Sequence, residues 1–439
     1  MNLALDKNLS THMDANSTTI NRFKMQVNKF SGIVSKGLPK TKCRMVKEFL
    51  YGIQASKDVK LSNISRALKE DIPLIKTEDR LSRNLGSCDM TDHLNHQILR
   101  LADDKIDDSM VIAIDPGDIM KPYAKAMEHL CCIYDGSAHI DARGYHLCQV
   151  TAANLAHDRI VPLYCEAYSS KAKDYPGSSE KLIEVITQVT EYTKKKGTWA
   201  IDRQGDDIDL IAHFQKEELQ FVTRLKMNRY LHFDNNLNKQ IKAERIHNHV
   251  KLNHKAHIYI TTDGKEEFLH LSFGAVSVAL PDDPANWYTL VIVEGFGKQP
   301  MLLLTNKQVN LHRSKELWRI VEIYLTRWKC DECYRYIKQS YNLEDVRVMS
   351  YNSVRNITVL VHSIAYFTSI YMGMSLKLKV LVQKVFILSK RFFGVPTFFN
   401  YAMADGIFEL LKTSRCGIIN FKGKTGISYQ GYQLSLFPD

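Results

Sequence analysis

Residues 324–338 read Tyr324-Leu-Thr-Arg327-Trp-Lys-Cys-Asp331-Glu332-Cys-Tyr-Arg-Tyr-Ile-Lys338, a pattern that predicts a helix carrying a hydroxyl, two cations and a carboxylate. At about 100° per residue, the two cations and Asp331 fall within about 60° of Tyr324, so they share one polar stripe. A neighbouring apolar stripe is expected to face the core, and it consists of Ile323, Cys330, Tyr334, Ile337 and Tyr341. The polar stripe then lies at the edge of the core, where a carboxylate between cations suits a metal ion and phosphate.

Two earlier stretches each end an apolar run with an aspartate. They are Val111-Ile-Ala-Ile-Asp115-Pro-Gly-Asp118 and Thr198-Trp-Ala-Ile-Asp202-Arg-Gln-Gly. Each run is short and apolar, which predicts a buried strand with the acid at its end. An isolated aspartate at such a position most often forms a turn or a cap. Two of them combined with the helix at 324–338 instead predict a site built from carboxylates.

With these three motifs in this order, the chain resembles bacterial insertion-sequence transposases of the DDE class. In the branch that it is similar to, the third motif reads Tyr, two residues, Arg, three residues, Glu, six residues, Lys. This sequence keeps the spacing but has Asp331 at the glutamate position, with Glu332 one residue later. Helical phase favours Asp331 as the third carboxylate, whereas the longer reach of a glutamate favours Glu332, so both are candidates.

The resemblance, which covers roughly 105 to 375, implies a ribonuclease-H-like mixed sheet flanked by helices, whereas the residue pattern alone indicates only the α/β class. It also implies a site with two Mg²⁺ ions, for which Mn²⁺ can substitute. Asp115 and Asp202 would bridge the metal ions, and Asp331 or Glu332 would complete the shell of the second ion. Two nearby spare carboxylates are Asp118 and Asp206.

The other motif residues are implied to bind DNA. Tyr324, Arg327 and Lys338 would contact phosphates near the cleaved end. Arg327 can grip phosphate oxygens with two N–H groups, and Lys338 acts as a point charge. The alternative is an ordinary helix salt bridge, in which Arg327 pairs with Asp331 one turn away.

The pattern divides the chain into five segments. They are a helical DNA-binding domain at 1–106, a first part of the catalytic domain at 107–227, a β-rich insertion at 228–298, a second part of the catalytic domain at 299–375, and a C-terminal helical region at 376–439. In some relatives an aromatic residue of the insertion holds a flipped base. Trp287 could do so here, although a buried strand position is the alternative.

A helix-turn-helix is predicted at 61–85. Ser62 and Thr77 would cap its two helices, and Pro73 would lie in the turn. Arg80 and Arg83 would then point outward from the second helix and could contact DNA. Any small helical domain gives the same pattern, so this alternative stays open.

Composition agrees with a nucleic-acid partner. The 439 residues have a net charge of +11, which attracts polyanions without specifying one. Nine cysteines without the dense spacing of a disulfide framework, and a start that lacks a signal-peptide pattern, favour a reducing compartment. We therefore expect a cytoplasmic, nucleoid-associated bacterial protein. The apolar segment 357–375 is expected to be a buried helix rather than a membrane span.

The resemblance of the three motifs implies a DNA transposase of the cut-and-paste type. It would bind terminal inverted repeats, cleave the transposon ends by metal-dependent hydrolysis and transfer the 3′ hydroxyl ends to target DNA. Two ends must be held together, so a homodimer on double-stranded DNA is expected. The alternatives are a ribonuclease-H-like nuclease without strand transfer, and a catalytically inactive DNA-binding regulator.

Overall fold

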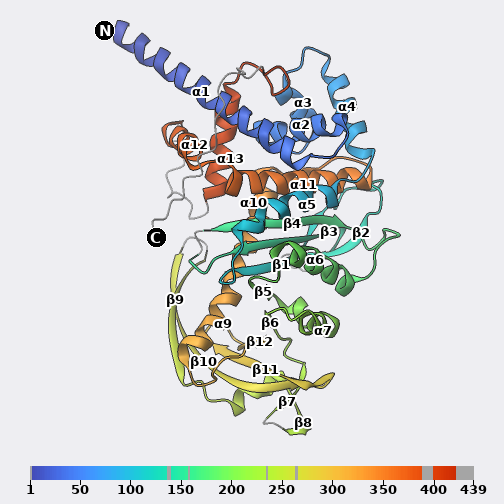
Figure 1. The fold of residues 1–439 in the computed structure, drawn as a ribbon, viewed down its shortest axis with the longest axis vertical. Coiled ribbons are helices and arrows are strands. Elements are labelled where there is room, and N and C mark those ends of the chain that lie inside the picture. Colours follow the sequence, from blue (N-terminus) through green and yellow to red (C-terminus); the bar gives the residue numbers. More distant parts are fainter. Residues whose placement is uncertain are drawn as a thin grey trace.

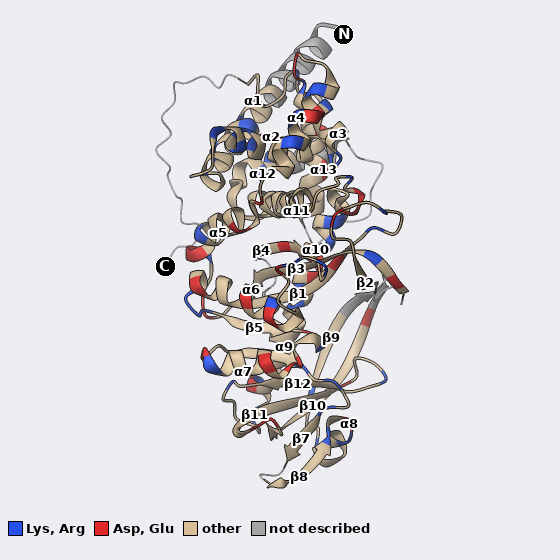
Figure 2. Cartoon of the chain, turned by 90° about the vertical axis from the view of Figure 1, so that its right-hand side faces the viewer, with Lys and Arg blue, Asp and Glu red and all other residues tan. Residues whose placement is uncertain are grey.

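The computed structural model describes residues 2–135, 140–156, 159–233, 236–262, 265–387 and 399–421. Three layers follow one another along its longest axis in two views turned by 90° (Figures 1 and 2). Helices from both ends of the chain form the first layer, a mixed sheet flanked by helices forms the second, and a β-rich part lies at the far end. The predicted α/β class with a large mixed sheet is therefore confirmed.

The helical layer combines segments from both ends of the sequence. It contains α1 (Asn2–Val34), α2 (Lys40–Ser56), α3 (Leu61–Leu68), α4 (Leu74–Gly86), α5 (Thr91–Ala102), α11 (Tyr351–Tyr366), α12 (Met374–Ile387) and α13 (Phe399–Lys412). α11 is buried along almost its whole length, because it contacts α2, α4 and α5 as well as strand β4 of the sheet. Residues 388–398 and 422–439 of the predicted C-terminal helical region lie outside the described residues.

The predicted helix pair at 61–85 is present as α3 and α4, but its caps differ from those expected. Pro73 is the N-cap of α4, and its fixed φ and missing N–H suit this position. Thr77 lies one turn inside the helix, and its hydroxyl donates to Glu70 at 3.0 Å. Ser62 likewise lies within α3 and caps nothing.

The described part of the chain forms one sheet of twelve strands. They are β1 (Val111–Met120), β2 (Cys131–Asp135), β3 (Ile140–Ala153), β4 (Ile160–Tyr168), β5 (Thr198–Ile201), β6 (Phe221–Arg224), β7 (Tyr230–Phe233), β8 (Asn236–Lys242), β9 (His254–Thr262), β10 (Lys265–Leu280), β11 (Asp283–Glu294) and β12 (Met301–Thr305). The central strands lie in the order β4-β3-β1-β5-β6. β3 is antiparallel to β1 and to β4, β5 is parallel to β1, and β6 is parallel to β5.

The β-rich residues predicted at 228–298 continue this same sheet. β12 pairs with β6 on one side and with β11 on the other, and the sheet then extends through β10 to β9, β7 and β8. This pairing covers the edge that β6 would otherwise expose.

The two faces of the sheet carry different helices. Side chains alternate along β1, so Ile112 packs in the core that includes α6 (Ser178–Thr193) and α7 (Ile208–Lys216). Val111 packs on the other face, against α9 (Ser314–Thr326). Asp115 has the same parity as Val111, so it points to the face of α9.

The helix predicted at 324–338 is interrupted at Arg327. α9 ends at Thr326, and α10 (Trp328–Ser340) begins two residues later. The N–H of Arg327 donates to the carbonyl of Tyr324 at 3.1 Å, and the N–H of Cys330 donates to Arg327 at 2.8 Å. These tighter turns shift the helical phase. The buried residues of α10 are therefore Cys330, Cys333, Tyr336, Ile337 and Ser340, of which only Cys330 and Ile337 belong to the predicted apolar stripe.

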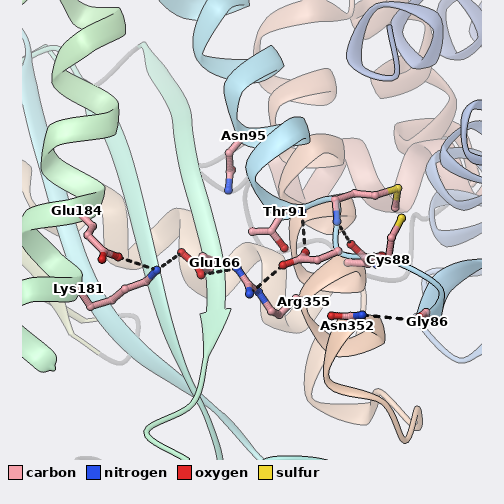
Figure 3. A network of polar contacts seen from close by, with 12 residues as sticks. Gly86, Cys88, Thr91, Asn95, Glu166, Lys181, Glu184, Asn352 and Arg355 are labelled. Carbon is pink, nitrogen blue, oxygen red and sulfur yellow. Dashed lines mark hydrogen bonds and ion pairs between the residues drawn. The ribbon is translucent and has the colours of Figure 1, made fainter. Parts of the chain in front are cut away.

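A buried ion-pair network joins the helical layer to the sheet (Figure 3). Arg355 of α11 pairs with Asp89, just before α5, at 2.8 Å and with Glu166 of β4 at 2.7 Å. Lys181 of α6 reaches Glu166 from the other side at 2.9 Å. The side chain of Glu166 is only 3% exposed. Glu166 of β4 therefore links two helices, α11 and α6, to the sheet, and Arg355 extends the network to Asp89.

Among the described helices, none taken singly has the length and apolar character needed to cross a membrane. One bent pair, Tyr351–Tyr371 with Met374–Val380, reaches that length and composition together, with an angle of 108° between its parts.

Candidate active site

Two aspartates lie side by side on neighbouring parallel strands, Asp115 within β1 and Asp202 just after the end of β5. The register of β1 and β5 pairs Ala113 with Ala200, and Asp115 and Asp202 come two residues later on each strand. Both side chains therefore point to the face that α9 covers. The carboxylate of Asp202 also accepts the N–H of Gln204 at 2.8 Å, which fixes its orientation at the strand end.

The start of α10 brings a third carboxylate and a cation to this point. Nη1 of Arg327 lies 2.9 Å from Oδ1 of Asp331 and 3.4 Å from Oδ1 of Asp115. The side chain of Arg327 is 10% exposed, that of Asp115 is 18% exposed, and that of Asp331 is 38% exposed. The site is therefore mostly buried at Asp115 on β1 and more open to solvent at Asp331 on α10.

The electrostatics of the cluster are dominated by burial and by crowding of like charges. Burial raises the pKa of Asp115 well above its ordinary value, the negative charges of Asp331 and Asp202 raise it further, and Arg327 opposes both effects. Burial disfavours the charged form of Arg327, yet Asp331 and Asp115 outweigh it, so the pKa of Arg327 is raised. Another cation is therefore favoured near these carboxylates.

The structure separates the two candidates for the third carboxylate. Asp331 lies in the cluster with Arg327 and Asp115. Glu332 instead pairs with Lys329 at 3.0 Å, one turn back on the same helix. The shift of helical phase at Arg327 leaves Asp331 facing β1 and turns Glu332 to a different side of α10.

Lys338 anchors the far end of β1 rather than joining the cluster. Its Nζ donates to the carbonyl of Asp118 at 3.2 Å and pairs with Glu344 at 2.5 Å. The hydroxyl of Tyr334 accepts the N–H of Asp118 at 3.0 Å and donates to its carbonyl. Gly117 is required here, because a Cβ would lie 2.8 Å from the Tyr334 hydroxyl. Asp118, one of the predicted spare carboxylates, therefore takes part in docking β1 on α10.

The other predicted spare carboxylate has a structural partner. Asp206 is 3% exposed and pairs with Arg229 at 2.6 Å. It also accepts the N–H of Lys226 at 2.7 Å. These contacts hold the segment after β6 against the segment after β5, away from the cluster around Asp115.

A basic pocket of about 490 Å³ opens beside the carboxylates. Its lining residues are Arg203, Arg224, Phe296, Gly297, Lys298, Gln299, Met301, Tyr324, Arg327 and Trp328. Tyr324 and Arg327 are thus shared between the predicted motif and this pocket. Trp328 is 40% exposed, and the ring of Phe296 meets it edge-on at 6.1 Å. The pocket offers cations and an aromatic surface but no acidic side chain.

The sequence motifs predicted only Tyr324 and Arg327 among these ten lining residues. The other lining residues that carry a charge or an exposed aromatic ring are Arg203, Arg224, Lys298 and Trp328. Two of them had a local signal, since Arg203 follows Asp202 and Trp328 follows Arg327. Arg224 and Lys298 had none, because they reach the pocket from distant parts of the chain. Trp287, the tryptophan considered from the sequence, is half-buried in β11 and does not line the pocket.

The two arginines predicted to contact DNA from α4 differ in their surroundings. Arg80 does not point freely outward as expected, because it pairs with Glu48 at 2.6 Å and with Glu70 at 2.5 Å. Glu48 is fully buried on α2, so Arg80 is needed there to compensate its charge. Arg83 is exposed, and its Nε lies 3.4 Å from the carbonyl of Asp79. Neither belongs to the cluster around Asp115.

The donor set suits a hard divalent cation such as Mg²⁺ or Mn²⁺, since all three acids offer carboxylate oxygens. Within the described residues, no group of three or more acidic, histidine or cysteine side chains stands in ligand geometry. The guanidinium of Arg327 lies between Asp331 and Asp115 and supplies the positive charge there. The three acids therefore fit a metal ion in their identity and charge. In this structure the guanidinium of Arg327 occupies the position between Asp115 and Asp331.

Neither a family model nor a curated protein matches this sequence significantly. Among solved structures, the chain is similar to a piggyBac transposase in a cryo-EM synaptic complex with hairpin DNA. The two share 12% identity with a TM-score of 0.40, and the match covers 88% of this chain and 82% of the other. The functional conclusion therefore rests on the residues of the site itself.

Proposed function

We propose that this protein is a metal-dependent DNA transposase. The observation that carries the proposal is the convergence of Asp115, Asp202 and Asp331 beside a pocket lined by four cations. Carboxylates from two neighbouring strands and a helix suit divalent metal ions, and the cationic pocket suits backbone phosphate. The transposase would bind terminal inverted repeats, cleave at the transposon ends and transfer the 3′ hydroxyl ends to target DNA.

The proposed catalytic unit is of the ribonuclease-H type. Its support is the strand order around β1, in which an antiparallel hairpin lies on one side and two parallel strands on the other. Asp115 lies within β1, Asp202 follows the end of β5, and Asp331 lies on α10, which packs against β1. The N-terminal helices are proposed to bind the ends of the transposon. The net charge of +11 of the whole chain agrees with a DNA partner.

Each residue of the site has a proposed role. Asp115, Asp202 and Asp331 would hold two Mg²⁺ or Mn²⁺ ions, which stabilise the charge on the attacking and leaving oxygens of a phosphodiester when bound. Arg327 and Tyr324 would orient the scissile strand from the pocket. Lys338 would act from further away, by keeping the end of β1 docked on α10. Joining two ends requires two such sites, so a homodimer on DNA is part of the proposal.

The third carboxylate can be tested by a matched pair of substitutions. Asp331→Asn is expected to lower the rate of DNA cleavage about a hundredfold or more, because it removes a charged ligand from the cluster. Glu332→Gln is expected to stay within about threefold of wild type, because it weakens a partly buried pair with Lys329 outside the cluster. Single-turnover cleavage of a labelled duplex measures both. The reverse ranking would make Glu332 the third acid.

The function itself is tested with a labelled duplex that carries the inverted repeats flanking the protein's own gene. Purified protein with Mg²⁺ or Mn²⁺ is expected to cut at the repeat boundary and to join the ends to added target DNA. Asp202→Asn and EDTA should each abolish both products. Cutting without joining would favour a nuclease, and binding that persists in EDTA without any cutting would favour a regulator.

A further inference from the structure

Arg327 belongs to two sites at once. On one side its Nη1 contacts the carboxylates of Asp331 and Asp115. On the other side it lines the basic pocket together with Tyr324 and Trp328. Its Nε is buried and has no hydrogen-bond partner within the described residues. A guanidinium has five N–H donors, so this arrangement leaves part of its donor capacity unused.

On its pocket side, Arg327 lies among other cations, and no acidic side chain of the lining balances their charge. Among the described residues, the other three cations of the pocket, Arg203, Arg224 and Lys298, make no side-chain ion pair. None of the lining residues is acidic. A second pocket, around Asp206 and Asp282, instead has acidic and basic residues together. The basic pocket thus differs in being uncompensated, and an entering phosphodiester would supply the missing charge.

The carboxylate side has the opposite property. Arg327 contacts Oδ1 of Asp331 and Oδ1 of Asp115, so a divalent cation held between these two carboxylates would compete with the guanidinium. With the arginine in place the negative charge of the cluster is already partly neutralised. A metal ion therefore binds well only when the guanidinium has moved off these oxygens.

We propose that Arg327 is an internal counter-ion that exchanges the carboxylates for a backbone phosphate of DNA held by Arg203, Arg224 and Lys298. The inference rests on the proposed function and adds its regulation: DNA in the pocket draws Arg327 away and so opens Asp115 and Asp331 to divalent metal ions. Binding of DNA and metal is then cooperative, and the coupling is equal in both directions. The metal site stays weak until a strand is present, which limits cleavage in the absence of correctly placed DNA.

The test measures Mn²⁺ binding rather than activity. Free Mn²⁺ is read from its EPR signal during titration of the full-length protein, with and without a duplex oligonucleotide, after subtraction of a titration of the duplex alone. Wild type is expected to bind Mn²⁺ about 5–150-fold more tightly with DNA, the usual range of such couplings. Arg327→Met keeps the length of the side chain without its charge, and it is expected to bind Mn²⁺ tightly even without DNA.

Two further variants keep the test decisive. Arg313→Met removes an exposed arginine that pairs with Glu316, and should behave as wild type. Arg224→Gln leaves the carboxylates and Arg327 intact, and should keep the metal affinity of the free protein but lose much of the gain from DNA. This second variant gives an answer even where Arg327→Met fails to fold.

The possible results distinguish failure of the arginine exchange from failure of the proposed transposase function. Equal Mn²⁺ affinity in wild type and Arg327→Met, with binding lost in Asp115→Asn, would overturn the exchange and leave the metal site standing. The same DNA-induced gain in Arg224→Gln as in wild type would also overturn it. No Mn²⁺ binding in any variant, with or without DNA, would remove the support for the proposed function as well.

Discussion

Asp115→Asn is expected to lower DNA cleavage by about a thousandfold or more while the protein keeps or gains thermal stability. A thousandfold corresponds to about 4 kcal/mol of transition-state stabilisation, within what a metal ligand supplies through its bound ions. Asparagine has nearly the same shape as aspartate, so the packing between β1 and α10 should persist. The loss of activity would therefore come from chemistry and not from the fold.

The direction of the stability change follows from the pKa of Asp115. Burial and the neighbouring Asp331 raise this pKa in the folded protein. Above its ordinary value of about 3.8, the folded state therefore binds more protons than the unfolded state, and stability falls as pH rises through this range. Asparagine does not ionise, so the variant lacks this cost at neutral pH. Its melting temperature should equal or exceed that of wild type at pH 7, and the difference should vanish near pH 4.

The control is Asp118→Asn, three residues later on the same strand. Asp118 faces Lys338 at 3.8 Å and lies outside the cluster, so its variant should retain most of the cleavage activity. Cleavage rates of both variants are measured with Mg²⁺, and melting curves are measured in the same buffer without Mg²⁺, because a bound metal ion would itself stabilise the wild-type protein. Loss of activity in Asp118→Asn with full activity in Asp115→Asn would place the site further along β1.

The positions of the two strand aspartates could be predicted from sequence because their signals are local. An apolar run before an aspartate marks a buried strand in both places, and the strand does end just before Asp202. The strand end expected at Asp115 was wrong, because β1 continues to Met120 through its pairing with β3. Neither apolar run shows that the two strands are neighbours, because this depends on the order of strands in the sheet. The helix carrying Asp331 was also predicted from its own pattern, but its interruption at Arg327 was not.

The parts that sequence could not give depend on partners far away in the chain. Arg80 looked free on a helical wheel, yet Glu48 from another helix pairs with it. Arg224 and Lys298 meet at the pocket only because β12 brings the β-rich part back beside β6. Ion pairs and pockets of this kind form between elements, so no spacing within one element reveals them.

Arg355→Met is expected to lower the free energy of unfolding by about 3 kcal/mol, the lower part of the range for breaking a buried ion pair. Arg355 is 12% exposed and compensates both Asp89 and Glu166. Its loss leaves Glu166 with Lys181 as its remaining cation and leaves Asp89 without this partner. The lower part of the range applies because Lys181 stays in place and Asp89 is 29% exposed, so water can reach it.

Thermal and urea unfolding followed by circular dichroism measure this change, and the exposed pair of Arg313 with Glu316 supplies the control. Arg313 is 72% exposed, so Arg313→Met is expected to change stability by less than about 0.5 kcal/mol. Arg355→Lys should fall between the two, because a single ammonium cannot reach both carboxylates with the fork of a guanidinium. If Arg355→Met had the same melting temperature as the Arg313→Met control, apolar contacts alone would hold α11 on β4. If it melts earlier, charge holds the helical layer on the sheet that carries Asp115 and Asp202, and changes at Asp89 or Glu166 should then affect DNA cleavage through the placement of α11.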